Sequence, residues 1–522
     1  MKNFVKIFAL ALLCASCADG FEVDTMDAGA VDGLPHDMIV LGKQLEDPYS
    51  LENMTKACEA LFPTKAGRVG LKATDRYVRL LPETQADFDR LEDMGLVMVD
   101  HPVDYEILKE GDYYHDPGLD DECITWQYAV VGMDFVCPEG VRCEEIHNCY
   151  IAEHDIQSKA SGIDWAAVER EAFRLTGNGD LLVPATRGSD AVPAGRISIV
   201  DDALEDPEPI GVAGVKVSCN SFVKFAHGYT DEEGYYKLNK SFSSDVRYRV
   251  VFENKKGFKM GFNLILVPAS YSTLGKHSPA GVNVTIDKNS DRKLFTRAVV
   301  NNAGYDYFNA CSANAGKLKT PPSNLRLWLF PKMRTSLPVM LQQGCMIDNS
   351  VIGEYLGDCS FLLKLFMPDI LLGLGGCDDY ASVYAEALHQ FAHASHYMVV
   401  GNSFWDQLVK YDAISFITSG GTHYGSGSGA GHNYCEIGEM WAYYMQTVLY
   451  RDRYPESPRT FGTEFWFYPQ IMLYLDDRGL DRFKLFLGFS SDVTDRETLQ
   501  ARLISLYPEY KNTINQAFSR YI

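Results

Sequence analysis

The order of apolar segments in the C-terminal half of this 522-residue chain constrains its fold most. Two apolar runs, at 325–330 and 369–375, have the length and composition of buried strands. A longer segment then begins after an aspartate pair, which can cap a helix, and continues to Gly401, a residue type that commonly ends one. After a glycine- and serine-rich loop at 419–431, the pattern is helical. Strands first and helices last predict an α+β unit, which we place at 291–522.

Two histidines lie four residues apart in the predicted helix. On a helix, His389 and His393 share a face, and their imidazoles can ligate one zinc ion. In the zinc-protease pattern H-E-x-x-H, a glutamate directly after the first histidine acts as general base. This chain has Gln390 there, and a neutral carboxamide cannot accept a proton. We therefore predict a metal site with a hydrolytic rate reduced about 10²–10⁴-fold.

The residues around the histidines resemble the gluzincins, a class of zinc metallopeptidases. The string H-Q-F-A-H-A-S-H-Y, which starts at His389, is similar to H-E-F-A-H-A-S-H-Y, and Glu439-Met-Trp-Ala resembles the E-x-aromatic-A element of these enzymes. The resemblance implies a zincin-like fold with Glu439 as the third zinc ligand. Glu436 could replace that ligand or orient a ligand histidine. His396, on the same helix face, could also support the site from behind its ligands.

Other side chains are candidates for supporting roles in catalysis. His432 and Tyr434 precede the third ligand, where related enzymes place a group that stabilises the oxyanion. His423 and Tyr424 are weaker candidates of the same kind. Glu386 shares the face of the histidines and could replace the base, although we expect it to point away from the attacking water. His432 and Tyr434 could equally be ordinary loop residues.

The middle of the chain, 194–290, alternates apolar and polar residues in short runs separated by turns. Its element Thr230-Asp-Glu-Glu-Gly-Tyr-Tyr resembles the carboxypeptidase regulatory-like domain, a small β-sandwich. The resemblance implies a role in spacing or presenting other domains. The preceding segment, 158–193, is predicted to be a linker that contains one helix at 165–174.

The first folded part is expected at 46–157, as a small α+β domain. A strand at 76–81, a helix at 83–94 and a strand at 97–99 form a βαβ-like unit. Four cysteines cluster in this region, and their spacings are too wide for a zinc knuckle, so we expect disulfides or buried thiols. They are Cys123, Cys137, Cys143 and Cys149.

The N-terminus has the features of an export signal. Lys2 and Lys6 accompany an apolar stretch followed by small residues, which predicts removal of 1–16 as a signal peptide. The Ala-Ser-Cys ending resembles a bacterial lipobox and implies lipidation of Cys17, with 17–45 as an acidic tether. We therefore expect an exported protein anchored to the bacterial outer membrane, facing the periplasm or the cell surface. Plain secretion is the alternative.

Charge and motif together suggest the class of partner. The formal net charge of −22 argues against nucleic acid, because phosphate binding needs clustered positive charge. We expect a multidomain α+β protein with a small N-terminal α/β domain, a β-sandwich and a zincin-like domain. Its partner would be a peptide or protein segment that could add as a strand beside 369–375. The alternatives are an active peptidase, with water, Glu386 or Glu436 replacing the base, and a metal-free scaffold.

Overall fold

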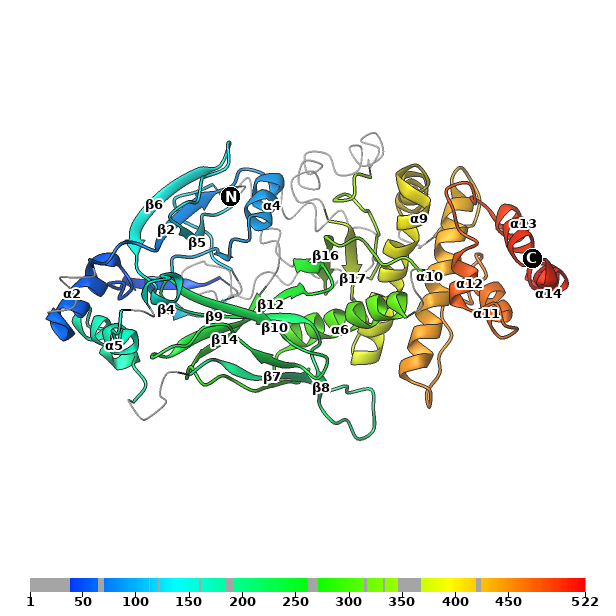
Figure 1. Ribbon diagram of the computed structural model, residues 1–522. Helices are drawn as coiled ribbons and strands as arrows, with labels where there is room; N and C mark the ends of the chain where they lie inside the picture. The colour runs from blue at the N-terminus through cyan, green and yellow to red at the C-terminus, as the bar shows by residue number, and fades with distance from the viewer. Residues whose placement is uncertain are drawn as a thin grey trace, which may run out of the picture.

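The chain is multidomain and mixed α+β, as expected (Figure 1). The computed structural model describes residues 38–521 except for 64–69, 112, 121–122, 159–160, 185–190, 262–270, 314–316, 332–333, 346–367 and 419–423. The N-terminal sheet and the C-terminal helices lie at opposite ends of the molecule, with the sandwich between them (Figure 1). The predicted signal peptide, Cys17 and most of the tether fall outside the described residues.

The N-terminal part is built on a four-stranded sheet in the order β3-β5-β2-β6. Helix α4 connects β2 to β3, and β5 lies between these two strands and antiparallel to both, so the predicted βαβ-like unit is a split one. Thr84 caps α4 in a capping box with Asp87, which fixes where the helix begins. The elements are β2 Asp75–Leu81, α4 Gln85–Asp93, β3 Met98–Val99, β5 Gln127–Gly132 and β6 Arg142–Cys149, with a separate antiparallel pair, β1 Val40–Gln44 and β4 Tyr105–Lys109.

The helix predicted within the linker packs against the N-terminal part. This helix, α5 (Trp165–Leu175), lies against α2 (Leu51–Leu61), as Figure 1 shows. Phe173 of α5 is fully buried and makes an edge contact with Tyr49 at a centroid distance of 5.8 Å. A 3₁₀ turn at Ala152–His154 precedes α5 and another at Gly179–Leu181 follows it. Much of the expected linker is therefore packed structure.

The middle of the chain forms two facing sheets, consistent with a sandwich. One contains β11-β7-β15 with β8 beside β7, and the other contains β10-β9-β12 with β14 beside β12. The inward side chains form one apolar core, because residues alternate between the two faces of a strand. The strands are β7 Ala194–Ile199, β8 Ile210–Gly211, β9 Val215–Ser221, β10 Lys224–Tyr229, β11 Tyr235–Lys237, β12 Val246–Asn254, β14 Tyr271–His277 and β15 Val284–Ile286.

The larger of these sheets continues into the C-terminal part. β13 (Phe258–Gly261) pairs with β12 on one side and runs parallel to β16 (Leu325–Phe330) on the other, and β16 runs parallel to β17 (Ile370–Gly373). The sandwich and the helices share one hydrophobic core. The predicted boundary at 290/291 is therefore crossed by a continuous sheet.

The outer edge of β17 is already paired by the chain itself. Leu337 and Leu371 exchange two backbone hydrogen bonds of 2.9 Å, and the Met340 N–H donates to the Asp369 carbonyl at 2.8 Å. The Gly373 N–H donates to the Ser336 hydroxyl at 3.0 Å. A peptide could add as a strand here, as the sequence predicts, only by displacing this segment.

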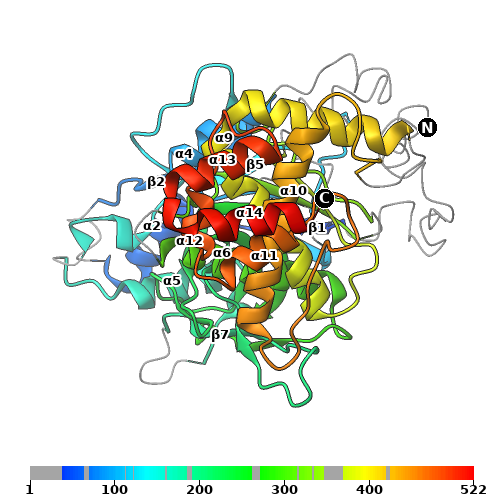
Figure 2. The ribbon, with the colours of Figure 1, turned by 90° about the vertical axis from the view of Figure 1, so that its right-hand side faces the viewer.

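Helices cover the C-terminal half of this sheet and extend beyond it. α6 packs on α9, and α9 on α10, while the short helices α11 to α14 lie over α10 at the C-terminal end (Figure 2). The helices are α6 Arg292–Ser312, α9 Tyr380–Thr418, α10 His432–Arg453, α11 Gln470–Asp476, α12 Arg482–Phe486, α13 Arg496–Leu506 and α14 Lys511–Arg520, with a 3₁₀ turn at Pro508–Tyr510.

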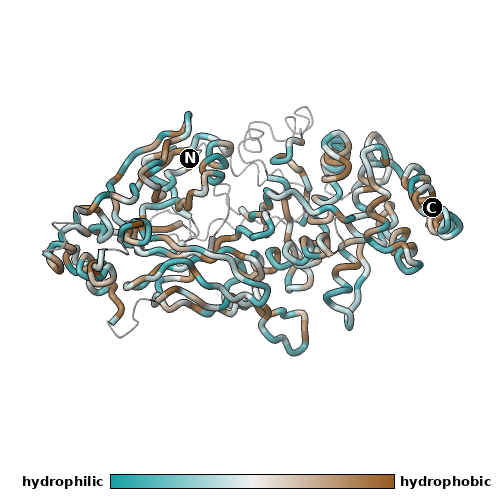
Figure 3. The backbone as a smooth tube through the Cα atoms, viewed as in Figure 1, coloured by the Kyte–Doolittle hydropathy of each residue, from teal (hydrophilic) through white to brown (hydrophobic). Residues whose placement is uncertain are grey.

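Two further features concern the membrane and the cysteines. Among the described residues, no helix has both the length and the apolar character needed to cross a bilayer, and hydrophilic and hydrophobic residues alternate along the helices (Figure 3). Cys137 and Cys143 form a disulfide, as expected for part of the cysteine cluster. Cys123 is a free, exposed thiol and Cys149 a free, buried one.

Candidate metal centre

Two packed helices bring His389, His393 and Glu439 together. The histidines project from α9 and the glutamate from α10. The two Nε2 atoms lie 3.0 Å apart, and Glu439 places one carboxylate oxygen 3.2 Å from Nε2 of His389 and the other 3.1 Å from Nε2 of His393. All three residues are at least 97% buried. Their donor atoms therefore converge in a buried space.

The local sequence explains how α9 presents this pair. Asp379 caps the helix start, since its carboxylate accepts the Ser382 N–H at 2.7 Å. At Gly401 the backbone is left-handed, with φ 71°, so the first helical segment ends there as predicted and the chain resumes as a second one. Trp405, just beyond this break, packs its ring 5.8 Å from His393. The break therefore lets one stretch of chain support its own histidine.

The three groups shift one another's pKa values. Burial would raise the pKa of Glu439, but the two histidines outweigh it and hold that pKa well below its usual range. Burial would lower the pKa of His389, but the bond and charge of Glu439 raise it above its ordinary value. For His393 burial prevails, so its pKa lies below normal. Glu439 is thus a stable carboxylate beside imidazoles, the protonation state that metal binding requires of a carboxylate.

The geometry of these donors fits a divalent metal. A tetrahedral zinc ion holds nitrogen and oxygen donors about 3.3 Å apart, close to the three distances found between the imidazoles and the carboxylate. Nδ1 of both His389 and His393 is buried and lacks a hydrogen-bond partner within the described part of the chain. Nε2 of each ring faces Glu439 and the other imidazole, so Nε2 is the atom that would ligate an ion. Three protein donors also leave a fourth position open.

Gln390, which occupies the position of the general base, and the nearby Glu386 lie in different surroundings. Gln390 is 98% buried, and its side-chain oxygen has no hydrogen-bond partner among the described residues. Glu386, one turn earlier on α9, is half-buried and accepts a hydrogen bond from the Ser336 hydroxyl at 2.7 Å. Ser336 in turn accepts the Gly373 N–H, so it ties the Glu386 carboxylate to the end of β17. Glu386 is thus held at the sheet edge.

The other predicted site residues make contacts elsewhere. His432 bonds the Gly429 carbonyl through Nδ1 at 2.8 Å, and the ring of Tyr434 packs 4.9 Å from Phe404. Glu436 accepts a bond from the guanidinium Nε of Arg496 at 2.8 Å. These contacts do not join His432, Tyr434 or Glu436 to the ligand group. The carboxylate of Glu436 is neutralised by an arginine, which makes it a poor alternative ligand.

His396 occupies an aromatic enclosure. It is completely buried, and its ring lies 5.3 Å from Phe404 and 4.8 Å from Phe489. Burial lowers its pKa to about 3, so the imidazole is neutral at physiological pH. Neither nitrogen has a hydrogen-bond partner among the described residues. These contacts make His396 a packing residue behind the site. It lacks the hydrogen bond to His389, His393 or Glu439 through which it would orient them.

Two tyrosines lie beside this group: Tyr443 directly, and Tyr424 through its contact with Tyr443. The ring of Tyr443 is 4.3 Å from that of His389, and its hydroxyl is 3.3 Å from the hydroxyl of Tyr424. Burial and the charge of Glu439 raise the pKa of both phenols. Tyr443 is four residues after Glu439 on α10, a spacing that could have indicated it. Tyr424 follows 419–423, so the other weak candidate, His423, lies outside the described residues.

Asp412 and Cys435 form a buried layer beside Glu439. Their donor atoms lie within 4.8 Å of each other and of a Glu439 oxygen. Burial, followed by the charge of Glu439, raises the pKa of Asp412 well above its usual range. Asp412 is thus held protonated and neutral, which allows a second carboxyl group to lie beside an ionised one.

Comparison with known proteins adds nothing to these observations. No family model matches the chain, and no curated protein or solved structure is significantly similar to it.

Proposed function

We propose that this protein is an exported, lipid-anchored relative of the gluzincins that binds zinc through His389, His393 and Glu439. It would hold a peptide or protein segment near this site and hydrolyse it poorly or not at all. The observation that carries the proposal is the convergence of two imidazole nitrogens and one carboxylate within 3.0–3.2 Å in a buried space. Such a set is the usual zinc-binding triad of a hydrolase.

The residues around the triad support an impaired centre. When bound, zinc would act as a Lewis acid toward a peptide carbonyl. Gln390 lies in the base position and can donate or accept hydrogen bonds there, but it cannot take up a proton. Tyr443 and Tyr424 keep their protons at physiological pH and can donate hydrogen bonds toward a polarised oxygen. The chain thus retains binding groups and lacks the general base.

A rival function is an active peptidase with a different base. Glu386 is the observation that favours it, because this carboxylate is on the ligand-bearing face of α9 one turn before Gln390. Its bond to Ser336 holds it at the sheet edge, and we therefore regard it as a structural residue. A metal-free scaffold is the second rival.

One set of variants separates these possibilities. We expect His389→Ala to contain about one zinc per chain less than wild type by elemental analysis, and the exposed control His277→Ala to match wild type. Gln390→Glu should gain peptide hydrolysis about 10²–10⁴-fold over wild type, and Gln390→Glu combined with Glu439→Gln should lose it. Wild-type hydrolysis abolished by Glu386→Gln would favour the active peptidase. Equal zinc content in wild type and His389→Ala would favour the scaffold.

A further inference from the structure

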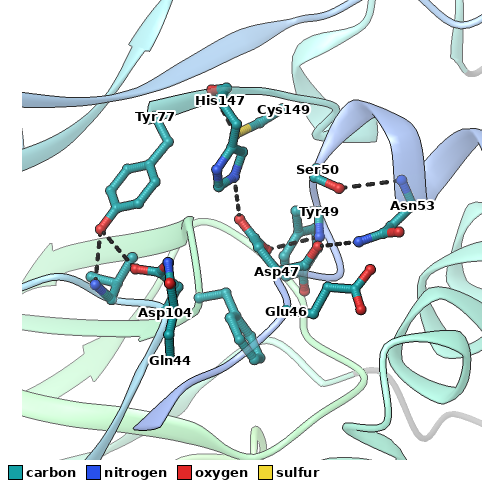
Figure 4. A network of polar contacts seen from close by, with 12 residues as sticks. Gln44, Glu46, Asp47, Tyr49, Ser50, Asn53, Tyr77, Asp104, His147 and Cys149 are labelled. Atoms are coloured by element: carbon teal, nitrogen blue, oxygen red, sulfur yellow. Dashed lines mark hydrogen bonds and ion pairs between the residues drawn. The ribbon is translucent and has the colours of Figure 1, made fainter. Parts of the chain in front are cut away.

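A second group of metal-ligand side chains lies in the N-terminal part, far along the chain from the zinc triad (Figure 4). His147 and Cys149 are two residues apart on β6, so both side chains are on the same face of the sheet. Asp47 reaches them from the turn between β1 and α2. One imidazole nitrogen, one sulfur and one carboxylate oxygen lie within 4.8 Å of one another.

Backbone and side-chain bonds hold these donors in place. Nε2 of His147 lies 2.8 Å from Oδ2 of Asp47, and Oδ1 of Asp47 accepts the Tyr49 N–H at 2.9 Å. The ring of Tyr77 lies edge-on, 5.3 Å from that of His147. The Cys149 sulfur makes a long contact of 3.9 Å with the His147 carbonyl. Histidine and aspartate are therefore oriented toward each other, and the buried sulfur lies beside them.

We propose that Asp47, His147 and Cys149 form a second transition-metal site, which takes zinc or a similar borderline divalent ion. Sulfur, imidazole and carboxylate together are a donor set used for zinc, whereas calcium and magnesium take oxygen donors. Three protein donors leave one position for water or a ligand. This inference goes beyond the proposed function and does not depend on it.

The burial pattern suits an ion with limited access to solvent. Asp47 is 96% buried and Cys149 completely buried, but the His147 side chain is 26% exposed and provides a route for the ion. Asp47, Asp75 and Glu145 all add negative charge around the sulfur. A divalent cation would relieve this repulsion and would replace the thiol proton, as metal coordination does.

Only a small adjustment closes the site. Zinc holds nitrogen, oxygen and sulfur donors about 3.3–3.7 Å apart, so the sulfur needs to move by no more than about 1 Å toward the other two donors. Rotation about the Cα–Cβ bond of Cys149 would supply this shift, with loss of its long contact with the His147 carbonyl. The simpler alternative is a histidine–aspartate ion pair beside an inert thiol.

Cobalt binding distinguishes a metal site from an ion pair beside an inert thiol. The full chain carrying His389→Ala and His393→Ala, which removes the first site, would be titrated with Co²⁺ alone. We expect one equivalent to bind and to produce the near-ultraviolet charge-transfer band of a thiolate ligand. Cys149→Ser should abolish the band, and His147→Gln should weaken cobalt affinity at least about tenfold. The control Cys123→Ser, at the exposed free thiol, should change neither.

Several results would overturn the proposal. They are no bound cobalt, a spectrum without the thiolate band, and a band that persists in Cys149→Ser. Since Cys149 is buried, its replacement could unfold the domain, and His147→Gln keeps the test valid because that side chain is partly exposed. If far-ultraviolet circular dichroism shows His147→Gln to be folded and its cobalt affinity is unchanged, the site is an ion pair beside an inert thiol.

Discussion

Asp369 shows how a single buried carboxyl group can set the pH dependence of stability. It lies just before β17, and burial raises its pKa to about 7, although bonds from Gln343 and the Arg326 N–H partly oppose this rise. The folded state therefore holds this proton to higher pH than the unfolded chain does. Stability from this group is complete below about pH 4, the unfolded pKa, and is lost as the pH rises through about 7.

We therefore predict that Asp369→Asn reduces the loss of stability that wild type shows as the pH rises from 5 to 8. Urea unfolding at pH 5 and pH 8 should show a decrease for wild type on the order of 2–4 kcal/mol and a smaller decrease for the variant. The exposed Asp378→Asn, at the start of the next helix, is the matched control and should behave as wild type. An identical decrease in Asp369→Asn and wild type would show that this carboxyl is not the responsible group.

The candidate site also shows what residue spacing can and cannot predict. The shared face of His389 and His393 follows from helix geometry, and Glu439 came from resemblance to a known element. Tyr443 is four residues after Glu439, a helical spacing that predicts a shared face. Tyr424 had no comparable signal, because its approach depends on a loop and on a backbone with φ 63°. Side chains on loops follow no helical or strand periodicity, so the sequence does not indicate which of them reach a site.

At the scale of elements, the local sequence pattern predicted the positions of strands and helices well. It did not predict which strands pair with each other. The strand expected at 325–330 is β16, and the helix expected at 83–94 is α4 shortened by its cap. The parallel pairing of β13 with β16 was missed, because partners distant in sequence leave no local trace. For the same reason, nothing in the sequence showed that Leu337 would cover the edge of β17.

The contact between α6 and α9 depends on Gly304. A Cβ there would lie 2.5 Å from Phe391 and 2.6 Å from Phe258, so only glycine allows the helices this close. Phe391 follows Gln390 on α9, and displacement of its ring would disturb His389 and His393, which lie on the same helix. We predict that Gly304→Val costs about 1–3 kcal/mol in urea unfolding and lowers zinc retention on dialysis. Thr296→Ala, on the same helix, should change neither; unaltered stability of Gly304→Val would show that the helices can move apart freely.

At the scale of the whole molecule, a buried ion pair joins the N-terminal part to the sandwich. Lys224 on β10 is 97% buried and bonds Glu169 of α5 at 2.8 Å and Glu153 at 2.7 Å. The Ser243 hydroxyl also donates to Glu169. Burial would raise the pKa of Glu169, but Lys224 outweighs it and the pKa is lowered. This carboxylate therefore adds stability above about pH 4.5, its unfolded value, and that stability is lost as the pH falls through the lower folded pKa.

We predict that removing one partner of the Lys224–Glu169 ion pair lowers the free energy of unfolding more than removing both. Lys224→Met leaves a buried carboxylate unpaired and should cost about 3–5 kcal/mol at pH 7 in urea unfolding, whereas Lys224→Met with Glu169→Leu should recover most of this loss. The double variant should also lose less stability than wild type between pH 5 and pH 3. The exposed pair Lys56–Glu52 serves as control, since Lys56→Met should leave the urea unfolding midpoint close to that of wild type. A double variant as unstable as Lys224→Met would mean that packing, rather than charge, joins the two parts.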